Sequence, residues 1–379
     1  MHSFSAQRIL RVLLAPFLLL GLQGCFWLWP LTQPTELHYA STPDGWKLAL
    51  HRYRPEKIAI EKEPVLLIPD FAMNRYNFDI AKDRSLPIYL YEKGYDVWIL
   101  ELRGAGESTK PNIFGMGEKE NTYTFDTFVE VDAPAAVEFV RYETRREQLS
   151  WVGHSMGAML GYAYLGLHPG EKTVRSFAAL AGPSSFPIRT QAGDFVLKAK
   201  ALAEMAVKTQ TSRLVAQAAS NNVGWVDNNF GPIRSFLLLG WDPYLAFESM
   251  LWNNEAVDAR TQSMVFQNAV ANISPNLFNQ TIDWMESGEF RSADKNVIYS
   301  ANLDRIHVPT LVATGKLDAI CPPMAAREVF EKLGTLDKAL RIVGKANGYS
   351  ADYGHLDLVI GDRSREDVFP LVFAWLEQH

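Results

Sequence analysis

The sequence predicts an α/β fold with a doubly wound, mostly parallel sheet and a helical cap inserted into it. Short apolar runs recur along the 379-residue chain and alternate with segments of helical periodicity. Continuous runs of this kind are typical of strands buried on both faces of a parallel sheet. The alternation breaks between about residues 183 and 300, where the chain is rich in Ala, Asn, Phe and Trp and contains nothing strand-like. We therefore expect one α/β core with a helical insertion.

The expected elements follow the chain in a simple order. Two segments of alternating polarity, 36–40 and 46–54, flank the turn Thr42-Pro43-Asp44-Gly45 and predict an antiparallel hairpin at the sheet edge. The runs expected as parallel strands are 65–68, 97–100, 149–152, 176–180, 310–313 and 340–343. The segments expected as helices are 80–93, 125–142, 156–167, 324–333 and 367–376. The first part of the core then spans 36–182, the cap 183–300 and the second part of the core 301–379.

Composition and charge narrow the class of protein. Hydrophobic residues make up 47% of the chain and charged residues 21%, as in a globular protein with a proper core. The net charge is −6, and no run of Lys and Arg forms a patch that would follow a phosphate backbone. Nucleic acid is therefore not expected as a partner.

Residues 1–24 are typical of a targeting segment rather than of a folded element. Two arginines precede an almost wholly apolar run over 12–22, which has the length of a signal-peptide core and is short for a transmembrane helix. The run ends in Leu22-Gln23-Gly24-Cys25, which resembles the bacterial lipobox, and this resemblance implies a lipid on Cys25. A tether then covers 25–35. The alternative is an uncleaved membrane anchor, and both interpretations place the protein outside the cytoplasm, at a membrane surface of the cell envelope.

Cysteine usage excludes two kinds of site. The chain has two cysteines, Cys25 and Cys321. If Cys25 carries lipid, Cys321 is left alone, so we expect neither a disulfide framework nor a zinc cluster built from thiolates. No metal and no organic cofactor is expected.

The stretch "LSWVGHSMGAML", residues 149–160, contains the candidate nucleophile. The pattern G-x-S-x-G around Ser155 is weak on its own, but here it follows a buried strand and opens a helix of small residues. Such a turn strains the serine backbone and lifts its hydroxyl clear of the sheet. The helix N-terminus and the backbone N–H of Met156 can then stabilise an oxyanion. The alternative is a glycine-rich turn without chemistry.

A serine nucleophile needs a general base, and four histidines follow Ser155 in the chain. His168 comes at the end of the helix after the turn, His307 precedes a strand, and His379 is the last residue. His355 lies in "GYSADYGHLDLVIG", in the loop after the last expected strand. That loop is at the carboxyl edge of the sheet, where Ser155 also lies, so we predict His355 as the base.

The acid that orients the base is expected between the serine and the histidine in chain order. Asp318, in "TLVATGKLDAICPP", comes just after a strand and so at the same edge of the sheet. Asp304 precedes that strand, and Asp352 is a weaker candidate. Asp357 is so close to His355 in sequence that we expect it to bond to backbone within the same loop. We predict Asp318 as the acid, with the capping of a turn as its alternative role.

Five stretches carry a resemblance to a known family. They are "VLLIPDFAMN", "DVWILELRGAGES", "WVGHSMGAML", "GKLDAICPP" and "YGHLDLVIG". Over about residues 40–379 the chain resembles the α/β-hydrolase superfamily, and most closely its lipase and esterase branches. The resemblance implies Ser155 as nucleophile, Asp318 as acid and His355 as base, with the segment 183–300 as a cap over the active site.

One stretch departs from the family pattern. Members usually have His-Gly-x after this strand, with the N–H of x as the second oxyanion donor, whereas this chain has Pro69-Asp70-Phe71. The resemblance implies that the donor is the backbone N–H of Phe71. A carboxylate beside a developing oxyanion would cost on the order of several kcal/mol in a dry site. We therefore expect Asp70 to point away, towards an arginine such as Arg75 or Arg103, or else the activity to be weak.

These residues predict a Ser-His-Asp hydrolase that cleaves carboxylic esters through an acyl-enzyme. The aromatic and aliphatic cap favours apolar acyl esters, and a membrane anchor favours lipid. Two alternatives stay open. An acyltransferase would use the same triad with an alcohol in place of water, and a non-catalytic lipoprotein would bind lipid or a protein partner through the cap. The sequence carries no prediction of acyl length, head group or oligomeric state.

Overall fold

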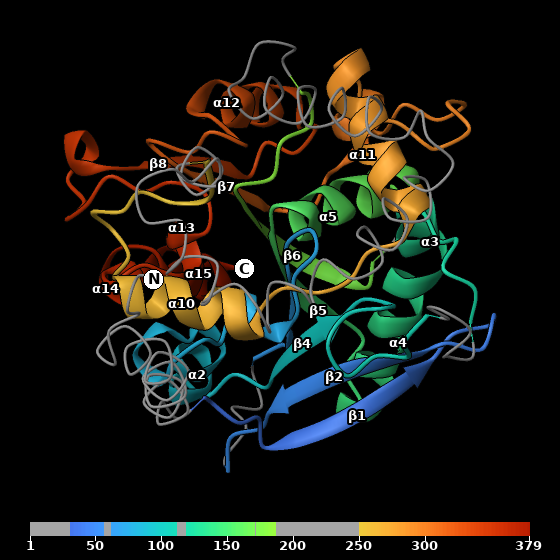
Figure 1. The fold of residues 1–379 in the computed structure, drawn as a ribbon, viewed down its shortest axis with the longest axis horizontal. Coiled ribbons are helices and arrows are strands. Elements are labelled where there is room, and N and C mark those ends of the chain that lie inside the picture. Colours follow the sequence, from blue (N-terminus) through green and yellow to red (C-terminus); the bar gives the residue numbers. More distant parts are fainter. Residues whose placement is uncertain (1–30, 57–61, 112–118, 171, 187–249) are drawn as a thin grey trace, which may run out of the picture. The chain divides into compact units, whose positions relative to one another are not determined.

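The structure is a computed structural model that describes residues 31–56, 62–111, 119–170, 172–186 and 250–379. Two compact units divide the chain, Met1–Gln33 and Pro34–His379, and the sheet belongs to the second. Its eight strands run in the order β1-β2-β4-β3-β5-β6-β7-β8 (Figure 1). The pairs β1-β2 and β2-β4 are antiparallel, and the other pairs are parallel. The predicted doubly wound, mostly parallel α/β fold is confirmed.

The hairpin lies at the sheet edge, as predicted. It consists of β1 (Glu36–Ser41) and β2 (Lys47–Tyr53), which pair in register from Glu36↔Arg52 to Ser41↔Lys47. Its turn is closed by the Thr42 hydroxyl, which accepts the backbone N–H of Trp46 at 2.9 Å. Gly45 has a φ of 80°, a left-handed conformation that glycine adopts without strain.

The remaining strands form at the predicted apolar runs. They are β3 (Val65–Ile68), β4 (Val97–Glu101), β5 (Leu149–His154), β6 (Val174–Leu180), β7 (Thr310–Gly315) and β8 (Lys338–Val343). The central strands are buried along almost their whole length, because helices cover both faces of the sheet, and this is why their sequences are continuously apolar. The carboxyl ends of β3, β5, β7 and β8 meet at one edge, so the segments that follow them can form a common site.

Helices cover both faces of the sheet (Figure 1). One face carries α4 (Ala133–Thr144), α5 (Met156–Leu167) and α12 (Pro323–Lys332), and the other carries α2 (Leu86–Glu92) and α15 (Phe369–Gln378). The turn α3 (Phe125–Thr127) and the π-helix η3 (Phe128–Asp132) lead into α4. The shorter elements are η1 (Arg75–Asn77), η2 (Lys82–Arg84), η4 (Tyr299–Arg305), η5 (Lys345–Asn347), α13 (Asp357–Ile360) and α14 (Ser364–Asp367).

The helix predicted over 80–93 begins later than expected. The short 3₁₀ turn η2 comes first, and α2 starts at Leu86. The Ser85 hydroxyl caps the helix by accepting the backbone N–H of Ile88 at 3.1 Å. Pro87, which lacks an N–H, is tolerated in the first turn only, so the helix cannot extend towards residue 80.

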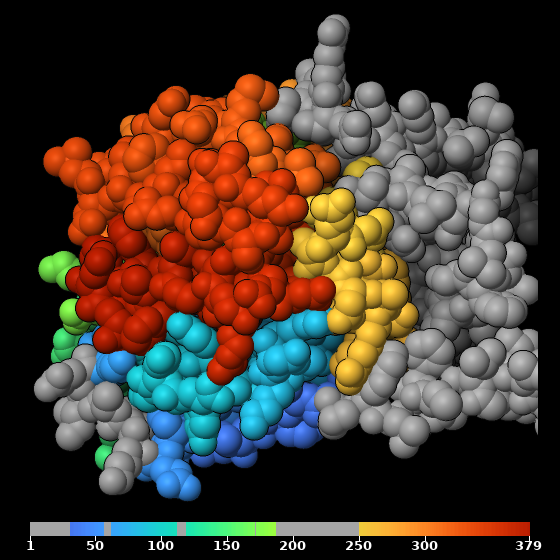
Figure 2. Space-filling model, turned by 90° about the vertical axis from the view of Figure 1, so that its left-hand side faces the viewer, coloured from blue at the N-terminus to red at the C-terminus, as the bar shows by residue number. Residues whose placement is uncertain are grey.

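The described part of the predicted cap, 183–186 and 250–300, is partly helical. It contains α10 (Ala259–Asn268) and α11 (Pro275–Ser287), and no named strand lies within these residues. Figure 2 shows α10, in yellow, against the cyan and red segments of the core, and Arg84 joins them by binding Asp258 at 2.8 Å and Asp362 at 3.0 Å.

Several predictions concern residues that the structure does not describe. The signal peptide at 1–24, the lipidation site Cys25, the start of the tether and residues 187–249 of the cap lie outside the described residues. Within the described ranges, no helix is both long enough and apolar enough to span a membrane.

Candidate active site

Ser155 lies on a sharp turn between β5 and α5. Its backbone has φ 49° and ψ −112°, a conformation that costs a non-glycine residue about 1–3 kcal/mol. The motif glycines permit the close packing around this turn. A Cβ on Gly157 would lie 2.0 Å from the carbonyl oxygen of Ile68, and one on Gly153 would lie 2.3 Å from the backbone of Gly157. The strained strand–turn–helix geometry that the sequence predicts is therefore present.

Asp318 and His355 lie against each other at the same edge of the sheet. Nδ1 of His355 is 3.0 Å from Oδ1 and 2.9 Å from Oδ2 of Asp318, and both side chains are buried. Asp318 also accepts the backbone N–H groups of Ile320 at 2.8 Å and Cys321 at 2.7 Å. A carboxylate held in this way accepts a hydrogen bond from Nδ1–H, so that in the neutral ring the other nitrogen, Nε2, carries the lone pair that a base needs.

The other candidate acids and bases are bound elsewhere. Asp357 accepts the backbone N–H of Gly354 at 2.9 Å, within its own loop as expected. Asp352 accepts the backbone N–H of Lys345 at 2.8 Å. Nδ1 of His168 lies 2.8 Å from the carbonyl oxygen of Tyr164, one turn back on α5. Asp304 is exposed within η4, before β7.

The expected orientation of Asp70 is wrong. Its carboxylate points into the site, where Oδ1 accepts the backbone N–H of Phe71 at 2.5 Å and that of Met156 at 3.4 Å. Oδ2 lies 3.4 Å from Nε2 of His355. The Asp70 side chain therefore contacts both predicted oxyanion donors and the predicted base.

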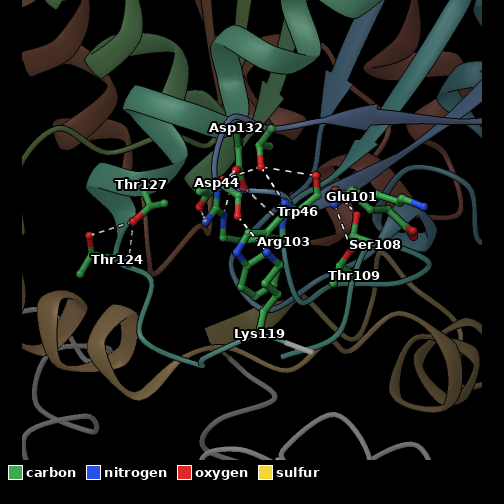
Figure 3. A network of polar contacts seen from close by, with 12 residues as sticks. Asp44, Trp46, Glu101, Arg103, Ser108, Thr109, Lys119, Thr124, Thr127 and Asp132 are labelled. Atoms are coloured by element: carbon green, nitrogen blue, oxygen red, sulfur yellow. Dashed lines mark hydrogen bonds and ion pairs between the residues drawn. The ribbon is translucent and has the colours of Figure 1, made fainter. Parts of the chain in front are cut away.

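The two arginines that might have drawn Asp70 away hold other carboxylates. Nη1 of Arg75 lies 2.7 Å from Asp79. Arg103 binds the buried Asp132 at 2.5 Å and Asp44, in the hairpin turn, at 2.7 Å, as Figure 3 shows. Within the described residues the charged partner of Asp70 is consequently His355.

The turn that presents Phe71 does not require glycine at position 70. The left-handed residue of this turn is Ala72, with a φ of 55°. The backbone N–H of Asp70 donates to Oδ1 of Asn77 at 3.0 Å, which fixes the turn against η1. The side chain at position 70 is therefore accommodated without strain in its own backbone.

Electrostatics favour an ion pair between Asp70 and His355. Burial lowers the pKa of His355, but the charge and hydrogen bonds of Asp318 and the nearby charge of Asp70 outweigh burial and raise the pKa to about 10. Burial raises the pKa of Asp70, but the attraction of the nearby His355 outweighs burial and lowers the pKa to about 2. At neutral pH the imidazole is thus protonated and the carboxylate ionised.

The bond expected between nucleophile and base is not formed. Within the described residues, Nε2 of His355 has no hydrogen-bond partner. Nε2 instead faces Oδ2 of Asp70 at 3.4 Å, and Oδ1 of Asp70 accepts the backbone N–H of Met156, next to Ser155. In this state Asp70 lies between the two groups that the triad would join.

Three residues that support the site were not singled out in the sequence. His154 lies beside His355, with ring centres 5.0 Å apart and Nε2 3.1 Å from the His355 carbonyl oxygen. Burial lowers the pKa of His154 to about 4, so this ring stays neutral at physiological pH. Asn77 fixes the turn of Asp70, and the Thr314 hydroxyl donates to Asp318 at 3.2 Å. Only His154 carried a signal, because it immediately precedes Ser155 in the motif.

No metal site accompanies these residues. Across the described ranges, no three His, Cys, Asp or Glu side chains are grouped as the ligands of a metal ion would be. Cys321 is buried, and burial raises the pKa of its thiol well above the usual range, as in an unreactive core cysteine.

The family follows from a direct match. The sequence profile of the family described as alpha/beta hydrolase fold matches residues 63–354, more than half of the chain. The chain belongs to the alpha/beta hydrolase family. This agrees with the strained serine turn after β5 and with the strand order of the sheet.

Relatives of this alpha/beta hydrolase include lipases. The chain is 34% identical over 167 residues to a protein named "Probable lipase" from Schizosaccharomyces pombe. The matched region covers 41% of this chain and 36% of that protein. It is 29% identical over 155 residues to the gastric triacylglycerol lipase of Mus musculus, and this matched region covers 39% of each chain. The match thus spans little more than a third of the length of these curated relatives.

Solved structures show the same fold over nearly the whole chain. A bacterial membrane phospholipase A described as a virulence factor has a TM-score of 0.53 at 17% identity, with 97% of this chain and 98% of that chain covered. An esterase from Exiguobacterium antarcticum has a TM-score of 0.50 at 16% identity, with 91% and 100% covered. At these identities the likeness concerns the fold alone.

Proposed function

We propose that this alpha/beta hydrolase cleaves carboxylic esters, with Ser155 as nucleophile, His355 as general base and Asp318 as the acid that orients the base. The observation that carries the proposal is the convergence of two backbone N–H groups, those of Phe71 and Met156, on a single oxygen atom beside Ser155. Two donors aimed at one point are what a developing oxyanion requires.

The proposed reaction follows from these positions. With His355 in its neutral form, the proton of the Ser155 hydroxyl passes to Nε2 of His355 while Oγ bonds to the ester carbonyl carbon. The carbonyl oxygen becomes an oxyanion held by the two N–H groups. His355 then gives its proton to the departing alcohol, which leaves an acyl-enzyme on Ser155. Water repeats the sequence and releases the carboxylic acid. Asp318 stabilises the imidazolium throughout.

Substrate class and location rest on different observations. The lipases among the relatives and the aromatic-rich segment 183–300 support an apolar acyl ester or a lipid as substrate. The lipobox-like stretch ending in Cys25 supports a lipoprotein held at a membrane surface of the cell envelope. A protein placed there meets lipid substrates directly.

One observation favours a second candidate function. The Asp70 carboxylate lies where the substrate oxygen would be stabilised. If it never leaves, the protein is a non-catalytic lipoprotein that binds lipid or a partner.

Ester turnover decides between the two candidates. We expect the wild-type protein to hydrolyse p-nitrophenyl esters of short or long acyl chains, and the variant S155A to lose this activity about a million-fold, down to the background of the assay. The variant S150A is the matched control, because Ser150 lies within β5 and its hydroxyl accepts a hydrogen bond from Ser176 at 3.0 Å. Turnover that is unchanged in S155A would overturn the proposal. A competing alcohol in the assay separates hydrolysis from acyl transfer by product analysis.

A further inference from the structure

Asp70 places a negatively charged oxygen at the point where the substrate oxygen is expected. Its Oδ1 accepts hydrogen bonds from both backbone N–H groups of the proposed oxyanion hole, from Phe71 at 2.5 Å and from Met156 at 3.4 Å. Its Oδ2 faces Nε2 of His355 at 3.4 Å. One carboxylate therefore occupies the hole and blocks the base at the same time.

We propose that Asp70 is an internal ligand of the oxyanion hole, which holds the free protein in a self-blocked state and must swing out before an ester can be attacked. The proposal rests on the proposed function, because it concerns the same hole, but it adds an occupant that a substrate has to displace. The bound carboxylate has the same chemistry as the carboxylic acid that ester hydrolysis releases.

The contacts of Asp70 explain why the side chain enters the hole. The residue precedes Phe71 directly, so its carboxylate reaches the N–H of its own neighbour. The N-terminus of the twelve-residue helix α5 contributes the Met156 N–H and a positive potential that attracts an anion. His355 supplies the charged partner, because Arg75 and Arg103 hold other carboxylates.

The same contacts explain why the side chain can leave. The partners of its carboxylate, Phe71, Met156 and His355, all belong to the proposed site. Among the described residues, no arginine binds this carboxylate and ties it to the surrounding fold. The oxygen of an ester carbonyl that enters the hole accepts hydrogen bonds from the two N–H groups in place of Asp70. The Ser155 hydroxyl can then form a hydrogen bond with Nε2 of His355. The self-blocked state lowers the apparent affinity for substrate by the fraction of molecules in which the hole is open.

The variant D70A removes the internal carboxylate and is compatible with the backbone, because the left-handed residue of the turn is Ala72 and not Asp70. We expect kcat/KM for p-nitrophenyl butyrate to rise at least about tenfold, in line with a mostly closed population in the wild type. We also expect butyrate to bind D70A at a concentration at least about tenfold lower than wild type, because the vacated hole accepts an external carboxylate. The variant D70N, which keeps the shape but not the charge, should fall between the two.

Two independent measurements, butyrate binding by calorimetry at fixed ionic strength and ester turnover, separate this inference from the proposed function. If D70A binds butyrate more tightly than wild type although neither protein turns over an ester, the inference holds and the proposed function fails. If both proteins turn over the ester at the same rate and bind butyrate equally, the inference is overturned and the proposed function stands. Folded D70N and D70A variants that both lose activity would also overturn it, because Asp70 would then assist the reaction rather than block it.

Discussion

Asp318 and Asp357 are both buried close to His355, yet they hold different partners. Asp318 binds the imidazole through both oxygens, whereas Asp357 accepts a backbone N–H of its own loop. Burial raises the pKa of Asp357 to about 7, so this carboxyl is partly neutral under physiological conditions. The geometry at Nδ1, rather than burial or proximity in sequence, therefore favours Asp318 as the proposed acid.

This difference gives a matched pair of substitutions. We expect D318N to lower kcat for ester hydrolysis by about 10⁴-fold, because the amide stabilises the wrong tautomer of His355 and cannot balance the imidazolium. We expect D357N to remain within about tenfold of wild type, because the substitution removes a charge that is only partly present. Equal losses in the two variants, measured with the same ester, would show that Asp318 has no special role.

The Asp70–His355 pair also makes stability depend on pH. Asp318 first, and then Asp70, raise the pKa of His355 from an ordinary value of 6.5 to about 10. The stability that the charged ring contributes is therefore complete below about pH 6.5 and is lost as the pH rises towards 10. The pKa of Asp70 is lowered from 3.8 to about 2, so its contribution is present above about pH 4 and is lost on acidification. We expect the difference in unfolding free energy between wild type and D70A to be largest between about pH 4 and 6.5. Urea denaturation across this range measures it, and a difference independent of pH would contradict the assignment.

The junction of β5 and α5 depends on one close backbone approach. Gly157 packs its Cα against the carbonyl oxygen of Ile68, at the end of β3, so that the serine turn and the Asp70 turn lie side by side. The β5–α5 junction, which carries the proposed nucleophile Ser155, is thus positioned by the turn after β3, which carries Phe71, the proposed second oxyanion donor.

Substitution of this glycine tests that dependence. We expect G157A to lower the free energy of unfolding by about 1–3 kcal/mol, because the added Cβ would lie 2.0 Å from a backbone oxygen that cannot move freely. The control is G170A, where an added Cβ meets nothing within 4 Å. Denaturant melts of the two variants give the comparison, and a G157A protein as stable as G170A would contradict the close approach.

The sequence predicts elements better than the direction of a single side chain. Buried parallel strands leave continuous apolar runs, so β3 appears at the predicted residues and the other parallel strands within a few residues of them. The helical pattern predicts a helix from residue 80, but α2 begins only at Leu86, because Ser85 caps it and Pro87 is tolerated only in its first turn. The direction of Asp70 depends on which carboxylates occupy Arg75 and Arg103, and these come from distant elements, so no local pattern contains that information.

The chain as a whole combines a hydrolase core with a proposed N-terminal membrane anchor. The core belongs to Pro34–His379, and the expected lipid site, Cys25, precedes it. The reaction needs neither cysteine, so anchoring and catalysis can be changed separately.

The two cysteines provide the test of anchoring. We expect C25A expressed in bacteria to lose metabolic labelling by palmitate and to leave the membrane fraction, because the lipid attachment site is gone. C321A, which changes the buried core cysteine, should keep the label. A C25A protein that stays in the membrane fraction would favour the uncleaved apolar anchor instead.

The proposed function depends most on the reactivity of Ser155, and a fluorophosphonate probe measures that reactivity directly. We expect wild-type protein to gain the mass of a single adduct, located by peptide mapping on Ser155, and we expect S155A to gain none. A correctly folded wild-type protein that remains unlabelled, or that carries the adduct on another residue, would contradict the proposed nucleophile.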